Sequence, residues 1–131
     1  MRTAVAASGT SRCDIRGIGP IGAAIIVGAV GDIGRFPTSG HFASYNATAP
    51  IDASSGNWAR HRLNPRGNRK LNHVLHIAAV TQLRYPSEGR HYYDKKLEEG
   101  KTSKEAIRAL KRRISDVVYR RLRAEARRTM S

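Results

Sequence analysis

The feature that most constrains the fold of this chain is an apolar stripe near its C-terminal end. Between residues 101 and 128, apolar side chains recur at intervals of three and four residues, which is the spacing of one face of an α-helix. Thr102 or Ser103 can cap this helix, and Glu105 lies in its first turn, where an acidic side chain is favourable. The side chains expected to form the buried face are Ile107, Leu110, Ile114, Val117, Val118 and Leu122.

Four earlier segments also show helical spacing between residues that begin or end helices. Pro20 suits the first turn of a helix, where its missing N–H has no cost, and Pro86 stops a helix that precedes it. No pair of strands is convincing. The chain is therefore predicted to be all-α, with about five helices and one long irregular basic loop over residues 46–66. The four earlier helical segments are expected at about residues 20–31, 37–45, 67–85 and 87–100.

Positive charge dominates the chain. It carries 24 Lys and Arg residues against 10 Asp and Glu residues, which gives a formal net charge of +14. Such an excess opposes compaction by self-repulsion unless an anionic partner neutralises it. A polyanion is the expected partner, and nucleic acid fits this chain better than a membrane does. An ordinary solvated basic surface is the alternative.

The single cysteine, Cys13, excludes an intramolecular disulfide and a zinc site built from several cysteines. This usage is typical of a reducing cytoplasm. The apolar run over residues 18–30 is shorter than the roughly 18 residues of a membrane helix, and glycines interrupt it. No membrane association is expected. Residues 1–13 are small and polar, and we expect them to form a disordered leader.

The segment Gly-Ile-Gly-Pro at residues 17–20 combines a flexible turn with the start of a helix. Glycine lets the backbone come close to a ligand, and the N–H groups of a helix N-terminus can bind phosphate. Gly17 and Gly19 are therefore candidate nucleic-acid contacts. Their arrangement resembles the hairpin of a helix-hairpin-helix module, which grips a DNA backbone without reading its sequence. The alternative is a tight turn that allows close helix packing.

The predicted basic loop contains two serines followed by arginines. Ser54 and Ser55 precede Gly56, and Arg60 and Arg62 come next. A serine hydroxyl is a weak nucleophile unless a base or nearby cations assist it. Arginine side chains can bind the non-bridging oxygens of a phosphate in forked geometry. Composition alone favours a turn at Ser-Gly followed by a basic patch.

The end of the loop joins the next helix through Arg66, Gly67, Asn68, Arg69 and Lys70. Backbone N–H groups and basic side chains together predict phosphate binding there. A well-capped helix with a basic face is the alternative. The last helix offers the same two interpretations, because residues 101–128 carry 11 Lys and Arg against 3 acidic residues. It can lie along a nucleic-acid backbone or expose a solvated face.

The sequence predicts no metal site and no cofactor in this chain. His73 and His76 lie three residues apart on one expected helix, but no third ligand is evident. The aspartates are scattered among turn residues. Both histidines are therefore expected at a helix surface or the edge of the core.

Several of these motifs follow one another in a specific order. They are "DIRGIGPIGAAIIVGAVGDIGRFPTSGHFASYNATAP" at residues 14–50, "SSG" at 54–56 and "NPRGNRKLNHVLHIAAV" at 64–80. Together they resemble the C-terminal domain of the Insertion Sequence 110 family transposases, which are relatives of the Piv site-specific invertase. No single motif would suffice, but their order and spacing are specific. The resemblance covers roughly residues 14–125.

The resemblance implies a two-part recombinase that acts on DNA. An N-terminal RuvC-like domain carries four carboxylates that hold a divalent metal, expected to be Mg²⁺. The C-terminal domain supplies a serine that attacks DNA and forms a covalent intermediate. This serine maps onto Ser55, with Ser54 as the less favoured neighbour. Some members use a guide RNA to choose their DNA, and the full enzyme is expected to be a homo-oligomer near the bacterial nucleoid.

The chain also departs from the family pattern. The acidic RuvC-like domain is not found in this sequence, so we expect residues 14–128 to be a transposase C-terminal domain that is inactive alone. Pro65-Arg66 stands where many members have a Ser/Thr-Lys-type pair, which puts fine DNA contacts in doubt. Asn46-Ala47-Thr48 replaces a more usual Ala-Gly-Leu and is expected to alter loop packing.

Three functions stay open at this point. The first is a serine-bearing transposase domain in which arginines position a scissile phosphate for Ser55. The second is a catalytically silent remnant that binds DNA, RNA or a full-length transposase. The third is a small basic RNA-associated or ribosome-associated protein, which a RuvC-like coding region immediately upstream would exclude.

Overall fold

The computed structural model describes residues 15–49 and 66–130, and the side chains of these residues except 66–68, 129 and 130. This part of the chain contains five α-helices, one short 3₁₀ helix and no strand, so the predicted all-α class is confirmed. The elements in chain order are α2 (Pro20–Val30), η1 (Ile33–Arg35), α3 (Ser39–Tyr45), α5 (Arg66–Leu83), α6 (Glu88–Glu98) and α7 (Ser103–Met130).

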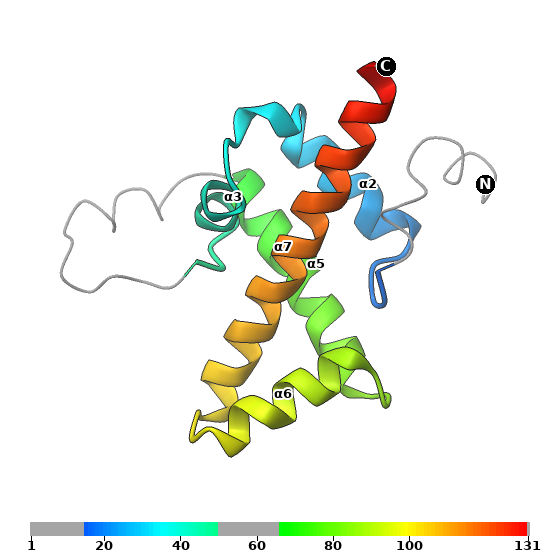
Figure 1. Ribbon diagram of the computed structural model, residues 1–131. Coiled ribbons are helices and arrows are strands. Elements are labelled where there is room, and N and C mark those ends of the chain that lie inside the picture. Colours follow the sequence, from blue (N-terminus) through cyan, green and yellow to red (C-terminus); the bar gives the residue numbers. More distant parts are fainter. Residues whose placement is uncertain (1–14, 50–65, 131) are drawn as a thin grey trace, which may run out of the picture.

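Helices α5 and α7 form the centre of the fold. They cross in Figure 1, with α7 in orange and red in front of α5 in green, and α6 connects their lower ends. Helix α2 packs against α5, whereas η1 and α3 pack against α7. The longest helix therefore contacts both halves of the described chain.

Capping residues set most helix ends as the sequence predicts. Helix α2 begins at Pro20 and ends at Val30, and the next residue, Gly31, caps it with a φ of 67°. Thr38 caps α3 by accepting a hydrogen bond from a backbone N–H in its first turn. At the start of α7, the Thr102 N–H donates to Glu105 Oε1 at 2.9 Å and the Glu105 N–H donates to Thr102 Oγ1 at 3.1 Å. This reciprocal pair satisfies two N–H groups that have no helical partner.

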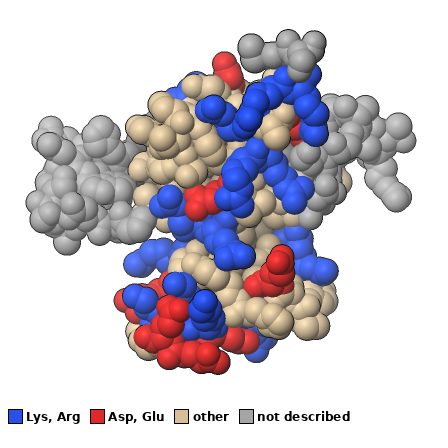
Figure 2. Space-filling view, viewed as in Figure 1, with Lys and Arg blue, Asp and Glu red and all other residues tan. Residues whose placement is uncertain are grey.

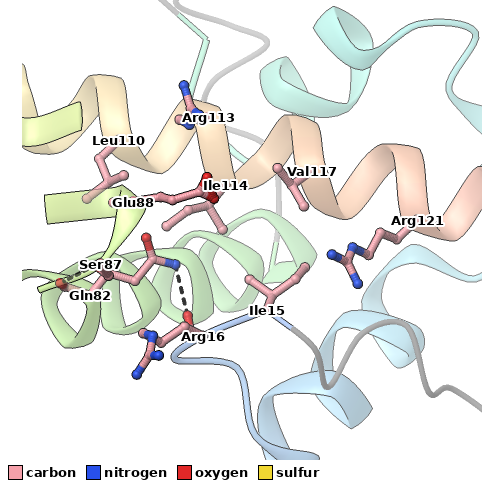
Figure 3. Close-up of a pocket in the computed structure, with 11 residues that line it drawn as sticks. Ile15, Arg16, Gln82, Ser87, Glu88, Leu110, Arg113, Ile114, Val117 and Arg121 are labelled. Atoms are coloured by element: carbon pink, nitrogen blue, oxygen red, sulfur yellow. Dashed lines mark hydrogen bonds between the residues drawn. The ribbon is translucent and has the colours of Figure 1, made fainter. Parts of the chain in front are cut away.

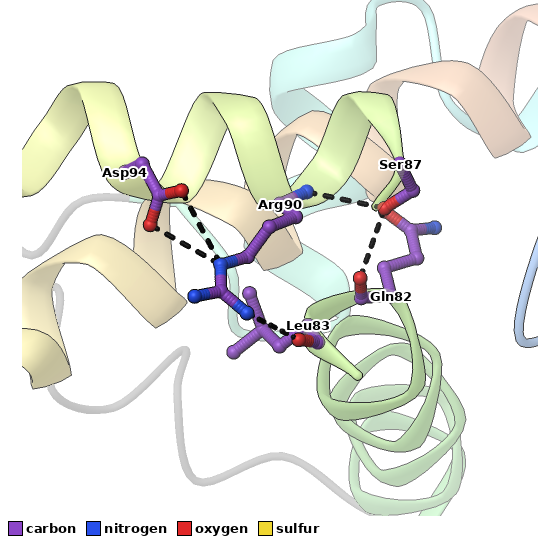
Figure 4. A network of polar contacts seen from close by, with 5 residues as sticks. All are labelled: Gln82, Leu83, Ser87, Arg90 and Asp94. Carbon is purple, nitrogen blue, oxygen red and sulfur yellow. Dashed lines mark hydrogen bonds and ion pairs between the residues drawn. The ribbon is translucent and has the colours of Figure 1, made fainter. Parts of the chain in front are cut away.

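The corner between α5 and α6 is closed by a polar network (Figure 4). Ser87 Oγ donates to the backbone oxygen of Gln82 at 2.9 Å and accepts from the N–H of Arg90. The Arg90 side chain donates to the backbone oxygen of Leu83 at 2.9 Å and pairs with Asp94 at 3.2 Å. One arginine thus satisfies a carbonyl at the end of α5 and stabilises the first turns of α6.

The core is mainly aliphatic and draws on every α-helix except α6. Burial of one such side chain is worth roughly 1.5–3 kcal/mol relative to exposure. Ile107 and Val117, which the sequence places on the buried face of α7, are only partly buried. The largest fully buried apolar side chains are Ile26, Val30, Phe42, Leu71, Leu75, Leu110 and Val118.

Helix α2 has no charged side chain on either face. Its inner residues Ala23, Ile26 and Val30 are buried, whereas Ile21 on the outside is 79% exposed. Its 11 residues are too few to span a bilayer. Across residues 15–49 and 66–130, no helix combines the length and apolar character that a membrane span needs.

Candidate nucleic-acid interface

Four of the predicted site residues, Ser54, Ser55, Arg60 and Arg62, lie outside the residues that the structure describes. Their roles stay predictions. The described chain stops at residue 49 and resumes at residue 66. The structure therefore informs the candidate site through the surroundings of these two positions.

The predicted contacts at the end of the loop gather at the start of α5. Arg66, Gly67 and Asn68 form the first turn of this 18-residue helix, which has no acidic residue there. The N–H groups of a first helical turn lack helical partners and carry partial positive charge. Arg69 and Lys70 follow and are exposed. Helix geometry and side-chain charge at this end both favour an anion.

The two glycines of the Gly-Ile-Gly-Pro segment differ in their surroundings. Gly17 has a φ of 93°, and a Cβ at this position would lie 2.7 Å from the Cα of Ala78 and 2.8 Å from its backbone oxygen. Close packing on α5 therefore accounts for this glycine. Gly19 precedes α2 and is exposed, and a Cβ added there would meet nothing within 4 Å. The helix-hairpin-helix likeness stays a prediction, because the residues before Ile15 lie outside those described.

A buried polar cluster joins α3, α5 and α7 where the chain leaves α3. We call it the polar junction and define it as Asn46, Thr48, Asn72, Lys111 and Ser115. The Asn46 side-chain amide donates to Ser115 Oγ at 2.9 Å, and the Asn72 amide donates to the backbone oxygen of Asn46 at 3.0 Å. Asn46 Oδ1 accepts from the N–H and the hydroxyl of Thr48 at 3.1 and 2.7 Å. Because Asn46, Thr48 and Ser115 are buried, these bonds fix the path of the chain up to Thr48.

Lys111 brings a positive charge to the edge of the polar junction. Its Nζ donates to Asn72 Oδ1 at 3.0 Å. Burial, and secondarily the charge of Arg108, lower the pKa of Lys111 below its ordinary value. Among the described residues, Lys111 has no carboxylate partner. A partly buried ammonium group without an acidic neighbour is stabilised by an anion that approaches it.

The polar junction includes a tight turn at Asn46, Ala47 and Thr48. Ala47 has a φ of 64°, in the left-handed region where glycine is favoured. Asn46 and Thr48 on either side hydrogen-bond to each other and hold this conformation. The side-chain bonds thus stabilise a turn that lacks a glycine.

Three exposed arginines form a line along the outer side of α7. Arg113, Arg120 and Arg127 are spaced seven residues apart, which is close to two helical turns, or about 10 Å along the axis. We call these three residues the arginine stripe. Figure 2 shows Lys and Arg atoms running along this helix. The apolar side chains of α7 face the opposite direction, toward the core.

Tyr119 ties α7 to the segment before α3, and Asp116 is paired within the helix. The Tyr119 hydroxyl donates to the backbone oxygen of Phe36 at 2.6 Å and accepts from Arg123 at 3.0 Å. Asp116, the acidic residue in the middle of α7, pairs with Arg112 at 2.9 Å. Its charge is therefore compensated locally and opposes the stripe only weakly.

The corner where α6 meets α7 has a different charge distribution. Figure 2 shows acidic and basic atoms intermixed at the lower end of the molecule. Lys96 pairs with Glu99 at 3.2 Å, and Glu105 lies in the first turn of α7. Farther along α7, basic residues outnumber the acidic residues Asp116 and Glu125.

The described residues offer no evident place for a metal ion. No group of three or more His, Cys, Asp or Glu side chains comes together in residues 15–49 and 66–130. His73 and His76 are exposed on α5. Partial loss of contact with solvent, followed by the charges of Lys111 and His73, lowers the pKa of His76. The family resemblance places its carboxylate site in a RuvC-like domain and not in these residues.

Sequence reasoning missed the polar junction. The sequence did contain one signal, which is the position of Ser115. It lies next to Ile114 and three residues before Val118, on the buried face of α7. A polar residue on a buried face needs a partner. The sequence could not reveal that Asn46, 69 positions away, would supply it.

Comparison with known proteins places the chain among transposases of insertion elements. The sequence model of the transposase IS116/IS110/IS902 family matches residues 13–94. The uncharacterized 43.6 kDa protein of insertion element IS110 from Streptomyces coelicolor is 36% identical over 108 residues, which cover 82% of this chain and 27% of that protein. No solved structure matches the chain.

Two further relatives show the same relationship. The uncharacterized 44.8 kDa protein of insertion element IS116 from Streptomyces clavuligerus is 35% identical over 82% of this chain and 27% of its own length. The uncharacterized 42 kDa protein of insertion element IS900 from Mycobacterium paratuberculosis is 32% identical over 81% of this chain and 27% of its own length. This chain thus spans 27% of the length of each relative. Its sequence over residues 13–94 confirms the resemblance, and the chain belongs to the IS116/IS110/IS902 family of transposases.

Proposed function

We propose that this chain is the nucleic-acid-binding part of a transposase and holds DNA along the arginine stripe of α7. The observation that carries this proposal is the line of Arg113, Arg120 and Arg127 on a helix whose central acidic residue is already paired. Arginine binds phosphate oxygens in forked geometry. A row of exposed arginines on a rigid helix can therefore follow a sugar-phosphate backbone without reading bases.

Two further features of the described chain support binding of a polyanion, although they lie away from the arginine stripe. The start of α5, with exposed Arg69 and Lys70, adds a helix N-terminus that favours anions. Lys111 at the polar junction adds a partly buried positive charge on α7. The net charge of +14 makes association with a polyanion favourable over the whole chain.

Within this function we propose Ser55 as the nucleophile, with Ser54 as the less favoured candidate. The family resemblance supports this assignment, and four arginines would position the scissile phosphate: Arg60, Arg62, Arg66 and Arg69. The hydroxyl oxygen would attack phosphorus, and the leaving strand would depart as its 3′ or 5′ oxygen takes up a proton. A RuvC-like domain would hold the divalent metal for this reaction, and a homo-oligomer and a guide RNA complete the proposed assembly.

DNA binding can be tested by fluorescence anisotropy with a labelled duplex. The test variant replaces the arginine stripe, Arg113→Gln, Arg120→Gln and Arg127→Gln. The matched control removes the same charge elsewhere, through Arg84→Gln, Lys95→Gln and Lys101→Gln, which are all exposed. We expect the stripe variant to bind roughly tenfold more weakly than the control, since both variants lose the same net charge but only the stripe variant loses direct phosphate contacts. Equal weakening in both variants would refute the stripe as the binding surface.

Testing Ser55 as the nucleophile requires an assay of the strand-attack reaction itself. The chain would be combined with DNA, RNA and a full-length relative that lacks its own serine domain. A covalent protein–DNA adduct that Ser55→Ala abolishes and Ser54→Ala leaves intact would support Ser55. An adduct that persists in Ser55→Ala would refute it.

The second candidate function is a catalytically silent nucleic-acid-binding remnant. The charge pattern that favours DNA binding supports it equally. It is distinguished by the same reaction, because it requires salt-dependent DNA binding without any adduct in the wild-type chain.

A further inference from the structure

A cavity of about 340 Å³ opens between the segment before α2, the corner of α5 and α6, and helix α7. Figure 3 shows Ile15, Ile114 and Val117 as its apolar walls. Its volume lies at the lower end of the roughly 300–1,000 Å³ range of small-ligand pockets. It has room for one compact ligand group.

Buried contacts hold the walls of this cavity in place. The Gln82 side-chain amide donates to the backbone oxygen of Arg16 at 2.9 Å, and Gln82 is only 8% exposed. Gly89 leaves room for this side chain, because a Cβ there would collide with Gln82 Oε1. Gly17 packs directly on the backbone of α5. The segment before α2 is thus fixed against α5, and the cavity is formed before any ligand arrives.

Charged groups of opposite sign face the cavity from two sides. In Figure 3, Glu88 extends from α6 and Arg121 extends from α7, with the apolar side chains between them. Glu88 makes no ion pair with any described residue. A ligand that fits has an apolar body and hydrogen-bond donors toward Glu88.

The cavity lies directly beside the arginine stripe. Arg113 belongs to the stripe and also lines the cavity. Its guanidinium is held over the Tyr92 ring at 4.7 Å from the centroid, which restricts where it can move. A nucleic-acid backbone that follows the stripe therefore passes the mouth of the cavity.

We propose that the cavity receives a single unpaired nucleobase from nucleic acid bound along the arginine stripe; this inference rests on the proposed function. The apolar walls cover the faces of the base, Glu88 accepts hydrogen bonds from its edge, and the phosphate stays with the arginines. Guanine is the preferred base, because its N1–H and N2 amino group both donate toward one side and match a carboxylate. Thymine is disfavoured, since two carbonyl oxygens flank its N3–H and repel the carboxylate.

The test compares three labelled duplexes of otherwise identical sequence. One is fully paired, one carries a single bulged guanine and one a single bulged thymine. We expect the wild-type chain to bind the guanine bulge roughly fivefold to tenfold more tightly than the thymine bulge. Glu88→Gln alters an exposed side chain and preserves its size. It should remove this preference while leaving affinity for the paired duplex unchanged. Val117→Phe should fill the cavity and bring both bulges to the affinity of the paired duplex.

The outcomes separate this inference from the function on which it rests. Salt-dependent binding of the paired duplex with equal affinity for both bulges would overturn the inference and leave the proposed function intact. A guanine preference that survives in both Glu88→Gln and Val117→Phe would overturn it as well. A chain that binds no duplex would refute the proposed function first. Circular dichroism confirms that each variant is folded before binding is measured.

Discussion

Two buried regions hold α7 in place, and they use different chemistry. On one part of its inner face, Leu110 and Val118 pack into an aliphatic core with Phe42. At the polar junction, Ser115 instead bonds to Asn46 at 2.9 Å. Apolar burial is roughly proportional to area and tolerates small shifts, whereas hydrogen bonds require particular partners and directions. The comparison teaches that the core supplies most of the stability, while the junction specifies where the chain leaves α3.

The largest effect should come from the apolar region. Leu110→Ala removes a fully buried side chain of α7 and should cost about 2–5 kcal/mol in the free energy of unfolding. Leu97→Ala on α6, where the side chain is 37% exposed, is the matched control and should cost much less. Urea denaturation of both variants measures the difference. Equal losses would mean that the packing around Leu110 is looser than described.

The next largest loss of stability should come from Gly17, where the backbone lies close to α5. Gly17→Ala places a Cβ 2.7 Å from Ala78 Cα at a φ of 93°, so the segment before α2 must move away from α5. We expect a loss of about 1–3 kcal/mol in the free energy of unfolding. Gly19→Ala meets nothing within 4 Å and should be nearly neutral. Thermal unfolding of the two variants would contradict this account if they lost equal stability.

Substitutions in the polar junction should cause the next largest loss of stability. The loss from one residue should depend on whether its hydrogen-bond partner is still present. Asn46→Ala leaves the Ser115 and Thr48 hydroxyls without their buried partner and should cost about 1–3 kcal/mol in the free energy of unfolding. Ser115→Ala should cost less. In the double variant the losses should be clearly smaller than additive, because the same bond is removed twice. Strict additivity would show that Asn46 and Ser115 are not coupled.

Exposed polar contacts should matter least. The backbone N–H of Thr102 lowers the pKa of Glu105 from its ordinary value of 4.5. The carboxylate therefore contributes stability above its unfolded pKa, and this contribution is lost as the pH falls through the lower folded pKa. Melting temperatures of wild type and Glu105→Gln should differ slightly at pH 7 and converge at acidic pH. A difference that persisted below the folded pKa would not come from the carboxylate.

Much of the fold could be predicted because its signals are local. Proline and capping residues mark where helices begin, as Pro20, Ser87 and Thr102 do. Helical periodicity identifies the buried face of α7, apart from Ile107 and Val117 at its margins, which the structure leaves partly buried. These features depend on residues within one or two turns, and the sequence contains them directly.

The candidate site was less accessible to prediction, because its contacts join residues far apart in the chain. Asn46 and Ser115 are separated by 69 positions, and Tyr119 bonds to the backbone of Phe36 across 83. Gly17 has the sequence context of a phosphate-binding turn, yet its closest neighbour is the backbone of Ala78. Only the packing of the segment before α2 on α5 distinguishes these two interpretations.

The salt dependence of DNA binding tests the central claim most directly. The slope of log K against log salt concentration counts the phosphates that the protein neutralises, at about 0.9 for each contact on duplex DNA. The variant of Arg113, Arg120 and Arg127 should show a shallower slope than wild type by about 0.9 for each stripe arginine that contacts phosphate. The control variant of Arg84, Lys95 and Lys101 should retain the wild-type slope. A stripe variant with the wild-type slope would contradict the claim that α7 holds DNA along this line.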